Sequence, residues 1–393
     1  MKSKKLFAAL AAVVAGVAAF SFAACGDDPA EPNNPNNPND PNNPVDPNPP
    51  VTEVYGLPVA DTGRYIKDSD LIADGDTRYL LYTTNETPGE NDNMIAVRKG
   101  TFEAGEGKGW KYGAESAAIT GEVGAWDENI ASASMVKGSF TYEETEYSWL
   151  MAYCATKESS ERQYNIGLAV ATAPDGEWTK VSETPLIQYD ADVYGATSVG
   201  CYAPSLVNLN KESAVRVFYT YADAYGHFAK FVDIDASDLG LLYTDAGRMS
   251  GEVQCPNHGS IAGGDNVAMF PNADFAYDAA AEKFYAIKDY SPAAATKPNY
   301  ADRIQLLTIA EEELYTEEVK EGWVGLKTWD FSDTEDGLWE RLYGACIVSD
   351  AYGHVDGTNA QEIIYNVCDL EMNDENWEFT QNLQSFVYTP EAE

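Results

Sequence analysis

From Val54 onward, short runs rich in Tyr and β-branched residues alternate with turns of Gly, Asp and Asn. Apolar runs of this length, each bounded by turn residues, predict β-strands joined by tight turns. No amphipathic pattern extends beyond about three helical turns, and the one short helix that the pattern favours lies at residues 310–315. The chain from residue 54 to residue 390 is therefore predicted to be all-β.

Five of these runs share a central tyrosine, and the tyrosines recur at intervals of 71, 66, 66 and 80 residues. Self-similarity at a roughly constant spacing is typical of repeat architectures. Each repeat has room for four antiparallel strands, which predicts a five-bladed β-propeller over residues 54–390. A pair of β-sandwich domains is the alternative. The five tyrosines are Tyr82, Tyr153, Tyr219, Tyr285 and Tyr365.

Each tyrosine run follows another apolar strand that opens on small or polar residues. In a propeller the first strand of every blade runs along the central axis, so these openings should converge on one funnel. The openings read DSDL (68–71), SASM (132–135), APSL (203–206), NADF (272–275) and GACI (344–347). The candidate site residues that they supply are Asp68, Asp70, Ser134, Ser205 and Asp274, with Tyr202 and Asn272 beside them.

The turns next to the openings add further candidates. Trp126 comes directly before Asp127 and Glu128, and a sugar ring packs its C–H face on Trp while carboxylates bind its hydroxyls. Ordinary packing within the blade is the alternative. His227 and His354 lie in similar Tyr-Gly-His turns, where one could approach the axis and where solvent exposure is the simpler interpretation. The other acids of these turns are Asp223, Asp265 and Asp350.

The N-terminus predicts an exported protein. Residues 1–24 combine a Lys-rich start, an apolar run and small residues before Cys25, as in a secretion signal. The stretch FAACG resembles the bacterial lipobox, which implies a lipid on Cys25 and a place in the bacterial cell envelope; cleavage after Ala24 without lipidation is the alternative. Residues 25–53, rich in Pro and Asn, predict a disordered, extended linker.

Charge narrows the classes of partner. The 64 acidic residues exceed the 25 basic ones and give a formal charge of -39, a field that repels nucleic acid and anionic membrane surfaces. We therefore expect a carbohydrate partner, membrane contact through the N-terminal lipid alone, and a monomer. No cofactor is indicated; Asp-rich turns make Ca²⁺ possible, although no Ca²⁺-binding loop motif is present. The five cysteines after Cys25 predict small buried side chains with at most one or two disulfides.

Three segments carry a resemblance to the five-bladed glycoside hydrolases of family 43. They are KDSDLIADGDTRYLLYTT (67–84), IGLAVATAPDGEWTKV (166–181) and YAPSLVNLNKESAVRVFYTYAD (202–223). The resemblance implies that Asp68 is the catalytic base. It also implies that the Asp that tunes the acid's pKa corresponds to Ser134 and that the acidic Glu corresponds to Tyr202, neither of which is a carboxylate here.

Inverting hydrolysis of a glycoside requires a carboxylate base and a protonated carboxylic acid on either side of the bond. Asp68 could provide the base, and the acid could come from Asp274 or from a loop acid such as Asp127, Glu128 or Asp223. We therefore expect a carbohydrate-active surface lipoprotein, with hydrolysis of a neutral oligosaccharide or polysaccharide as the leading hypothesis. A non-catalytic propeller that binds glycans is the alternative.

Overall fold

The computed structural model describes residues 55–391 apart from 91, 158–162, 191, 193–198, 224–225, 259–268, 291–300, 302, 316–321, 334–340 and 369–380. The predicted signal peptide, the linker, Cys25 and Asp265 lie outside the described residues. The chain divides into two units, Met1–Thr52 and Glu53–Glu393, and all the described residues belong to the second. None of the helices in the described ranges is long and apolar enough to cross a membrane.

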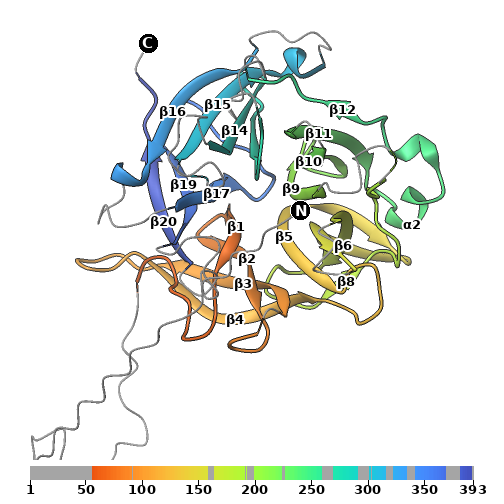
Figure 1. Ribbon diagram of the computed structural model, residues 1–393, viewed down its shortest axis with the longest axis horizontal. Helices are drawn as coiled ribbons and strands as arrows, with labels where there is room; N and C mark the ends of the chain where they lie inside the picture. Colours follow the sequence, from red (N-terminus) through yellow and green to blue (C-terminus); the bar gives the residue numbers. More distant parts are fainter. Residues whose placement is uncertain are drawn as a thin grey trace, which may run out of the picture. The chain divides into compact units, whose positions relative to one another are not determined.

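Five sheets, antiparallel except for one short parallel pair, surround a central axis and confirm the predicted five-bladed propeller (Figure 1). Each blade takes its strands from one continuous stretch of chain, and the first strands of neighbouring blades contact one another around the axis. Blade one contains β1 (Lys67–Asp74), β2 (Thr77–Asn85), β3 (Asn93–Phe102) and β4 (Trp110–Thr120), and blade two contains β5 (Asn129–Tyr142), β6 (Thr145–Thr156), β7 (Asn165–Ala171) and β8 (Trp178–Lys180). Blade three contains β9 (Gly200–Asn208), β10 (Ala214–Asp223), β11 (Gly226–Asp235) and β12 (Val253–Gln254), and blade four contains β13 (Asp274–Asp278), β14 (Lys283–Tyr290), β15 (Arg303–Ala310) and β16 (Val324–Asp330). Blade five contains β17 (Arg341–Ile347), β19 (Gln361–Cys368) and β20 (Asn382–Tyr388).

Helical elements are short in the described part of the chain. They are α2 (Leu239–Leu242) and the 3₁₀ helices Ala246–Arg248, Glu311–Tyr315 and Phe331–Asp333. The helix predicted at 310–315 is therefore confirmed as a 3₁₀ turn. The five described cysteines are all buried, as expected of small core side chains.

The core consists of five apolar clusters, one between each pair of adjacent blades. The cluster between blades three and four, for example, stacks Phe218 on Phe275 with ring centroids 4.1 Å apart. The cluster that joins blade five to blade one contains Leu71, Tyr82 and Ile364. Every blade packs on both of its neighbours. Burial of apolar surface therefore stabilises the contact between blades five and one, which closes the ring, as it does the other four contacts.

The predicted funnel openings share one backbone conformation. In each blade the first residue of the opening sequence has a positive φ, which L-residues adopt infrequently. The strand register shifts at this point in blades one, two, three and five, as it does at a β-bulge. The five residues are Asp68 (φ 50°), Ser132 (33°), Ala203 (47°), Asn272 (47°) and Gly344 (54°).

All five predicted tyrosine runs form the second strand of a blade, but blade four departs from the expected register. There Ile287 pairs with Asp274 of the first strand, and on this register the residue that matches the other four tyrosines is Lys288, three positions after Tyr285. Lys288 is fully buried, and its Nζ donates to the Met269 carbonyl at 2.8 Å. Burial lowers the pKa of this ammonium to about 7. The prediction of Tyr285 as the equivalent residue is therefore wrong.

One segment of blade five, residues 349–355, joins the other four blades at the end of the axis opposite the openings. We call it the axial segment. Its first two residues, β18 (Ser349–Asp350), pair in parallel with the end of β1 in blade one. Its carbonyls then accept backbone N–H groups from the first strands of blades two, three and four: Ala351 from Lys137 at 2.6 Å, Tyr352 from Asn208 at 2.9 Å, and Gly353 from Tyr277 at 3.0 Å.

Candidate functional site

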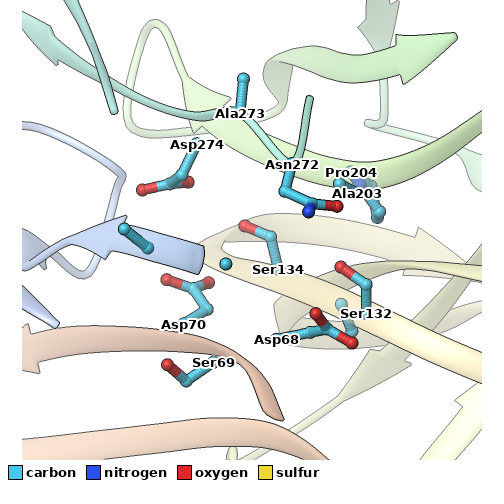
Figure 2. Close-up of a pocket in the computed structure, with 13 residues that line it drawn as sticks. Asp68, Ser69, Asp70, Ser132, Ser134, Ala203, Pro204, Asn272, Ala273 and Asp274 are labelled. Carbon is cyan, nitrogen blue, oxygen red and sulfur yellow. The ribbon is translucent and has the colours of Figure 1, made fainter. Parts of the chain in front are cut away.

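The five openings line one cavity at the mouth of the funnel. Its volume is about 30 Å³, which is space for roughly one water molecule. Asp68, Asp70 and Asp274 all border it, so three of the predicted acidic residues lie together (Figure 2). Its other polar residues are Ser69, Ser132, Ser134 and Asn272, and its remaining walls are Ala133, Ala203, Pro204, Ala273, Gly344 and Ala345.

Hydrogen bonds join neighbouring blades beneath this mouth. In blades one to four, the third residue of the opening turns its side chain to the next blade and accepts a backbone N–H there. Serines make this bond in blades two and three, so the bond itself does not require the carboxylates of blades one and four. Asp70 Oδ2 accepts the N–H of Met135 at 3.2 Å, Ser134 Oγ that of Leu206 at 3.0 Å, Ser205 Oγ that of Phe275 at 2.9 Å, and Asp274 Oδ2 that of Ile347 at 2.8 Å.

Asp70 and Asp274 face the same gap in the cavity (Figure 2). Burial raises the pKa of the Asp70 carboxyl to about 6, against hydrogen bonds from Met135 and Ser134. Burial and the neighbouring Asp70 carboxylate raise the pKa of Asp274 to about 7. Two carboxyls in one buried site cannot both ionise cheaply, so at least one of them holds a proton near neutral pH.

The backbone of Asp68 in blade one is held by blade five, its neighbour where the ring closes. Asn366 of blade five accepts the Asp68 N–H through Oδ1 at 3.0 Å and donates Nδ2 to the Ile66 carbonyl at 2.6 Å. The same position on the second strand of other blades makes a matching bond to the next opening. Thr83 Oγ1 accepts the Ser132 N–H at 2.9 Å, Thr220 Oγ1 that of Ala273 at 3.4 Å, and Asp289 Oδ1 that of Gly344 at 2.8 Å.

Asp289 is the carboxylate that the sequence interpretation missed. Its Oδ2 accepts the Asn272 amide at 2.6 Å, and burial raises its pKa to about 7. Asp68 Oδ1 lies 3.4 Å from the point that a β-carbon on Gly344 would occupy. Asp289 accepts the backbone N–H of the same glycine. The Asp68 and Asp289 carboxylates are therefore no more than about 9 Å apart. Asp289 lies two residues after Ile287, the residue of β14 that pairs with Asp274. An inspection of this position on each second strand would have identified it.

Tyr202, at the position that the resemblance gives to the acid, is bonded to His227. The Tyr202 hydroxyl lies 2.6 Å from His227 Nδ1, and the two rings meet edge to face. Burial raises the pKa of Tyr202 far above its ordinary value, and the carboxylates of Asp289 and Asp68 raise it further. This phenol is therefore a neutral hydrogen-bonding group.

The structure places the other predicted residues away from the cavity wall. Trp126 stacks on Tyr153 with centroids 5.8 Å apart, and Asp127 is buried between the Tyr153 hydroxyl (3.0 Å) and Lys180 Nζ (2.6 Å). Glu128 Oε2 accepts the Gly124 N–H of its own turn at 2.6 Å.

Asp223 and the second predicted histidine also lie outside the cavity wall. Asp223 Oδ1 accepts the Gly226 N–H at 3.1 Å within the β10–β11 turn. His354 approaches the axis as part of the axial segment, at the end opposite the cavity, where its Nε2 donates to the Asn208 carbonyl at 2.8 Å.

Metal binding has no cluster to support it within the described ranges. No group of three or more His, Cys, Asp and Glu side chains there is arranged to hold an ion. Asp70 and Asp274 are two carboxyls whose oxygens already accept hydrogen bonds from Met135 and Ile347.

Comparison with known proteins supports the fold. No family model matches the sequence, and no curated protein matches it. Among solved structures, the chain is similar to a thermostable family-43 glycoside hydrolase, with TM-score 0.52, 12% identity and coverage of 86% of this chain and 94% of that one. It is also similar to an α-L-arabinofuranosidase from Lactobacillus brevis (TM-score 0.51, 10% identity, 84% and 91% covered). A family 117 glycoside hydrolase from Zobellia galactanivorans has TM-score 0.50 and 12% identity, with 86% and 87% covered.

The chain therefore shares the five-bladed architecture of glycoside hydrolases of families 43 and 117, as the sequence resemblance implied. At 10–12% identity the likeness concerns the fold. What the funnel does depends on the residues within it.

Proposed function

We propose that this propeller binds a neutral carbohydrate at the mouth of the funnel and that Asp68 is the carboxylate that contacts it. The observation that carries this proposal is the position of Asp68, half-buried at the cavity wall and fixed by Asn366. A carboxylate at the rim of a funnel, on a backbone that is held in place, is suited to accept hydrogen bonds from sugar hydroxyls. The solved structures of the same fold are named as glycoside hydrolases, enzymes that act on sugars, and this supports a carbohydrate as the class of ligand.

Binding without hydrolysis fits the residues better than hydrolysis by the family 43 arrangement. Ser134 and Tyr202 occupy two positions at which that arrangement has carboxylates, and both side chains already make hydrogen bonds within the protein. The cavity below the rim has space for about one water, so a sugar ring would rest above it rather than beside Asp274.

Hydrolysis is the second candidate, because one observation favours it. The raised pKa of Asp274, about 7, leaves a protonated carboxylic acid in the cavity that Asp68 borders. An ionised base and a protonated acid at one site are the pair that inverting hydrolysis requires. In this candidate Asp68 activates water and Asp274 protonates the leaving oxygen.

The ligand that we propose is neutral. With a formal charge of -39, the protein repels polyuronates and other acidic glycans during approach. Uncharged chains such as arabinan, xylan, galactan and fructan fragments carry no such penalty.

We also propose that the mature protein is held at the cell envelope by a lipid on Cys25, with residues 26–53 as a spacer. The support is the sequence FAACG after an apolar run and the Pro/Asn-rich composition that follows. Expression in a lipoprotein-processing bacterium should leave the wild type in the membrane fraction and release Cys25→Ser. Equal recovery of both proteins in the soluble fraction would contradict this anchor.

The test of function reads two signals from the same samples. The domain of residues 54–393 is incubated with neutral oligosaccharides of arabinan, xylan, galactan and fructan, and both thermal shift and released reducing sugar are measured. A shift without release supports the binding function. Release that disappears in Asp68→Asn and Asp274→Asn would establish the hydrolase instead. Absence of both signals across the panel would overturn the carbohydrate proposal.

A further inference from the structure

Asn272 of blade four lines the same cavity as Asp68 of blade one, on its other side (Figure 2). Both are the first residue of an opening, both have a positive φ, and both are half-buried. Among the five first residues, these two alone carry an amide or a carboxyl group. Gly344, the first residue of the opening between them, also lines the cavity and has no side chain to fill it. The amide and the carboxylate therefore border one space across blade five.

Asp289, near the end of β14, holds Asn272 in place. Its backbone N–H donates to the Pro271 carbonyl at 3.1 Å, and its Oδ2 accepts Asn272 Nδ2 at 2.6 Å. Its Oδ1 accepts the Gly344 N–H at 2.8 Å, so both carboxylate oxygens are engaged. Asp289 is buried, so water does not compete freely for these bonds.

The bond to Asp289 determines which end of the Asn272 amide is available at the cavity. An ionised carboxylate accepts hydrogen bonds and donates none, so it selects the amide nitrogen and leaves the oxygen on the other side. Within the part of the chain that the structure describes, Asn272 Oδ1 has no hydrogen-bond partner, and it is not sealed from solvent. On a residue that lines the cavity, this oxygen is an oriented and accessible acceptor.

A purely structural role does not explain a carboxylate at position 289. Thr83 and Thr220, at the same position in blades one and three, bind the N–H of the next opening with a hydroxyl. Asp289 makes that bond with one oxygen and uses the other for Asn272. Burying a carboxyl is costly, and burial raises the pKa of this one to about 7. The second bond is what the carboxylate adds over a hydroxyl.

We propose that Asn272 is a second contact for the carbohydrate, with its Oδ1 accepting a sugar hydroxyl while Asp68 accepts another, and that Asp289 is the positioning residue that orients the amide. The inference rests on the proposed carbohydrate function and narrows its ligand. Both groups accept hydrogen bonds, and ring and glycosidic oxygens have no proton to give them. The ligand is therefore a neutral sugar with two free hydroxyls on one edge of its ring.

The first test compares the neutral oligosaccharide that gives the largest thermal shift with analogues in which fluorine, which donates no hydrogen bond, replaces one hydroxyl at a time. Titration calorimetry at about pH 8 keeps Asp289, with a pKa of about 7, ionised. At two positions fluorine should cost the wild type about three- to tenfold in affinity. In Asn272→Ala one of these two losses should disappear. Ala203 has the same φ of 47° as Asn272, so alanine is compatible with this backbone, and Asn359→Ala in an exposed turn is the control.

The second test isolates the positioning role of Asp289. In Asp289→Asn the new amide oxygen still accepts the Gly344 N–H, so its nitrogen faces Asn272 and should turn the Asn272 oxygen inward. The fluorinated analogue that binds the wild type about three- to tenfold more weakly should then bind as well as the parent sugar. A general structural effect would weaken both ligands alike and leave their ratio unchanged. Asp76→Asn, in the exposed β1–β2 turn, is the control.

The outcomes separate this inference from the function on which it rests. If no neutral oligosaccharide binds to the wild type, the carbohydrate function is removed and the Asn272 contact with it. If Asn272→Ala binds and keeps every loss that fluorine causes in the wild type, the Asn272 contact is wrong and the carbohydrate function stands. An unchanged ratio in a folded Asp289→Asn protein would remove the positioning role of Asp289.

Discussion

Asn366 of blade five and Asp68 of blade one are joined by a hydrogen bond across the closure of the ring, with Asn366 Oδ1 accepting the Asp68 N–H at 3.0 Å. The Asn366 amide also donates to the carbonyl of Ile66, and its side chain is fully buried. The residue on which the proposed function depends is thus held by the C-terminal blade.

Asn366→Ala should weaken carbohydrate binding although Asn366 does not line the cavity. The substitution leaves the Asp68 N–H and the Ile66 carbonyl buried without this partner, which should cost about 1–3 kcal/mol of unfolding free energy. Urea unfolding and calorimetric titration measure the two effects. Asn359→Ala, in the exposed turn before β19, is the matched control and should change neither. Unaltered affinity in Asn366→Ala would show that Asp68 does not depend on this bond.

Stability should fall as pH rises from about 4 to about 7. The folded-state pKa values of Asp70, about 6, and Asp274, about 7, exceed the ordinary value of 3.8, so the native state binds more protons than the unfolded chain in this interval. Stability from these groups is therefore complete below the unfolded pKa and is lost as pH rises through the folded values. The lowered pKa of Lys288 has the opposite effect on stability, which rises only as the pH increases above about 7.

Urea unfolding across this pH range checks the sign. Asp274→Asn removes one titrating carboxyl and should flatten the decline, whereas Asp76→Asn, in the exposed β1–β2 turn, should leave it as in the wild type. Parallel curves for wild type and Asp274→Asn would mean that the buried pair does not hold its protons as described.

Gly353→Ala should disrupt the axial segment. Gly353 has a φ of 77°, and a β-carbon there would lie 2.6 Å from the Leu206 carbonyl oxygen. Backbone must move to relieve this contact, and the bonds of the axial segment to blades two, three and four lie next to it. We expect a loss of about 2–4 kcal/mol in urea unfolding. Gly251→Ala, with open space around the added carbon, is the control. Equal stability of the two variants would argue against a structural role for the axial segment.

Neutral oligosaccharides should bind more tightly than uronate oligomers of the same length at low ionic strength. The formal charge of -39 repels an ionised ligand, and the difference should narrow as salt screens the repulsion. Affinity for xylo- and galacturono-oligosaccharides at low and high salt measures this. Tighter binding of the uronate at low salt would contradict the expected ligand class.

Much of the fold could be predicted because a propeller repeats its signals. Five tyrosine runs and five openings predicted the number of blades and their order. That the residues that begin the openings share one backbone conformation is visible only in the structure. The error at Tyr285 arose because Lys288 occupies the equivalent position, and a buried lysine carries no strand signal of its own. Spacing alone could not reveal a shift of three residues within one strand.

The site was harder to predict, because it depends on contacts between distant strands. Asp289 and Asn366 lie at the ends of second strands, and only the assembled ring brings them to Gly344 and Asp68. Trp126 and Asp127 adjoin the second opening in sequence but turn to Tyr153 and Lys180. The axial segment has no distinctive composition, and its role depends on backbone bonds to other blades.

The most direct test of the central claim is the change in carbohydrate affinity on Asp68→Asn, measured by titration calorimetry with the neutral oligosaccharide that gives the largest thermal shift. Asparagine tolerates the positive φ of this position, so the backbone should be retained. The account predicts at least about a tenfold loss of affinity, the worth of a charge-assisted hydrogen bond, with an unfolding temperature close to that of the wild type. Affinity equal to that of wild type in a folded Asp68→Asn protein would contradict it.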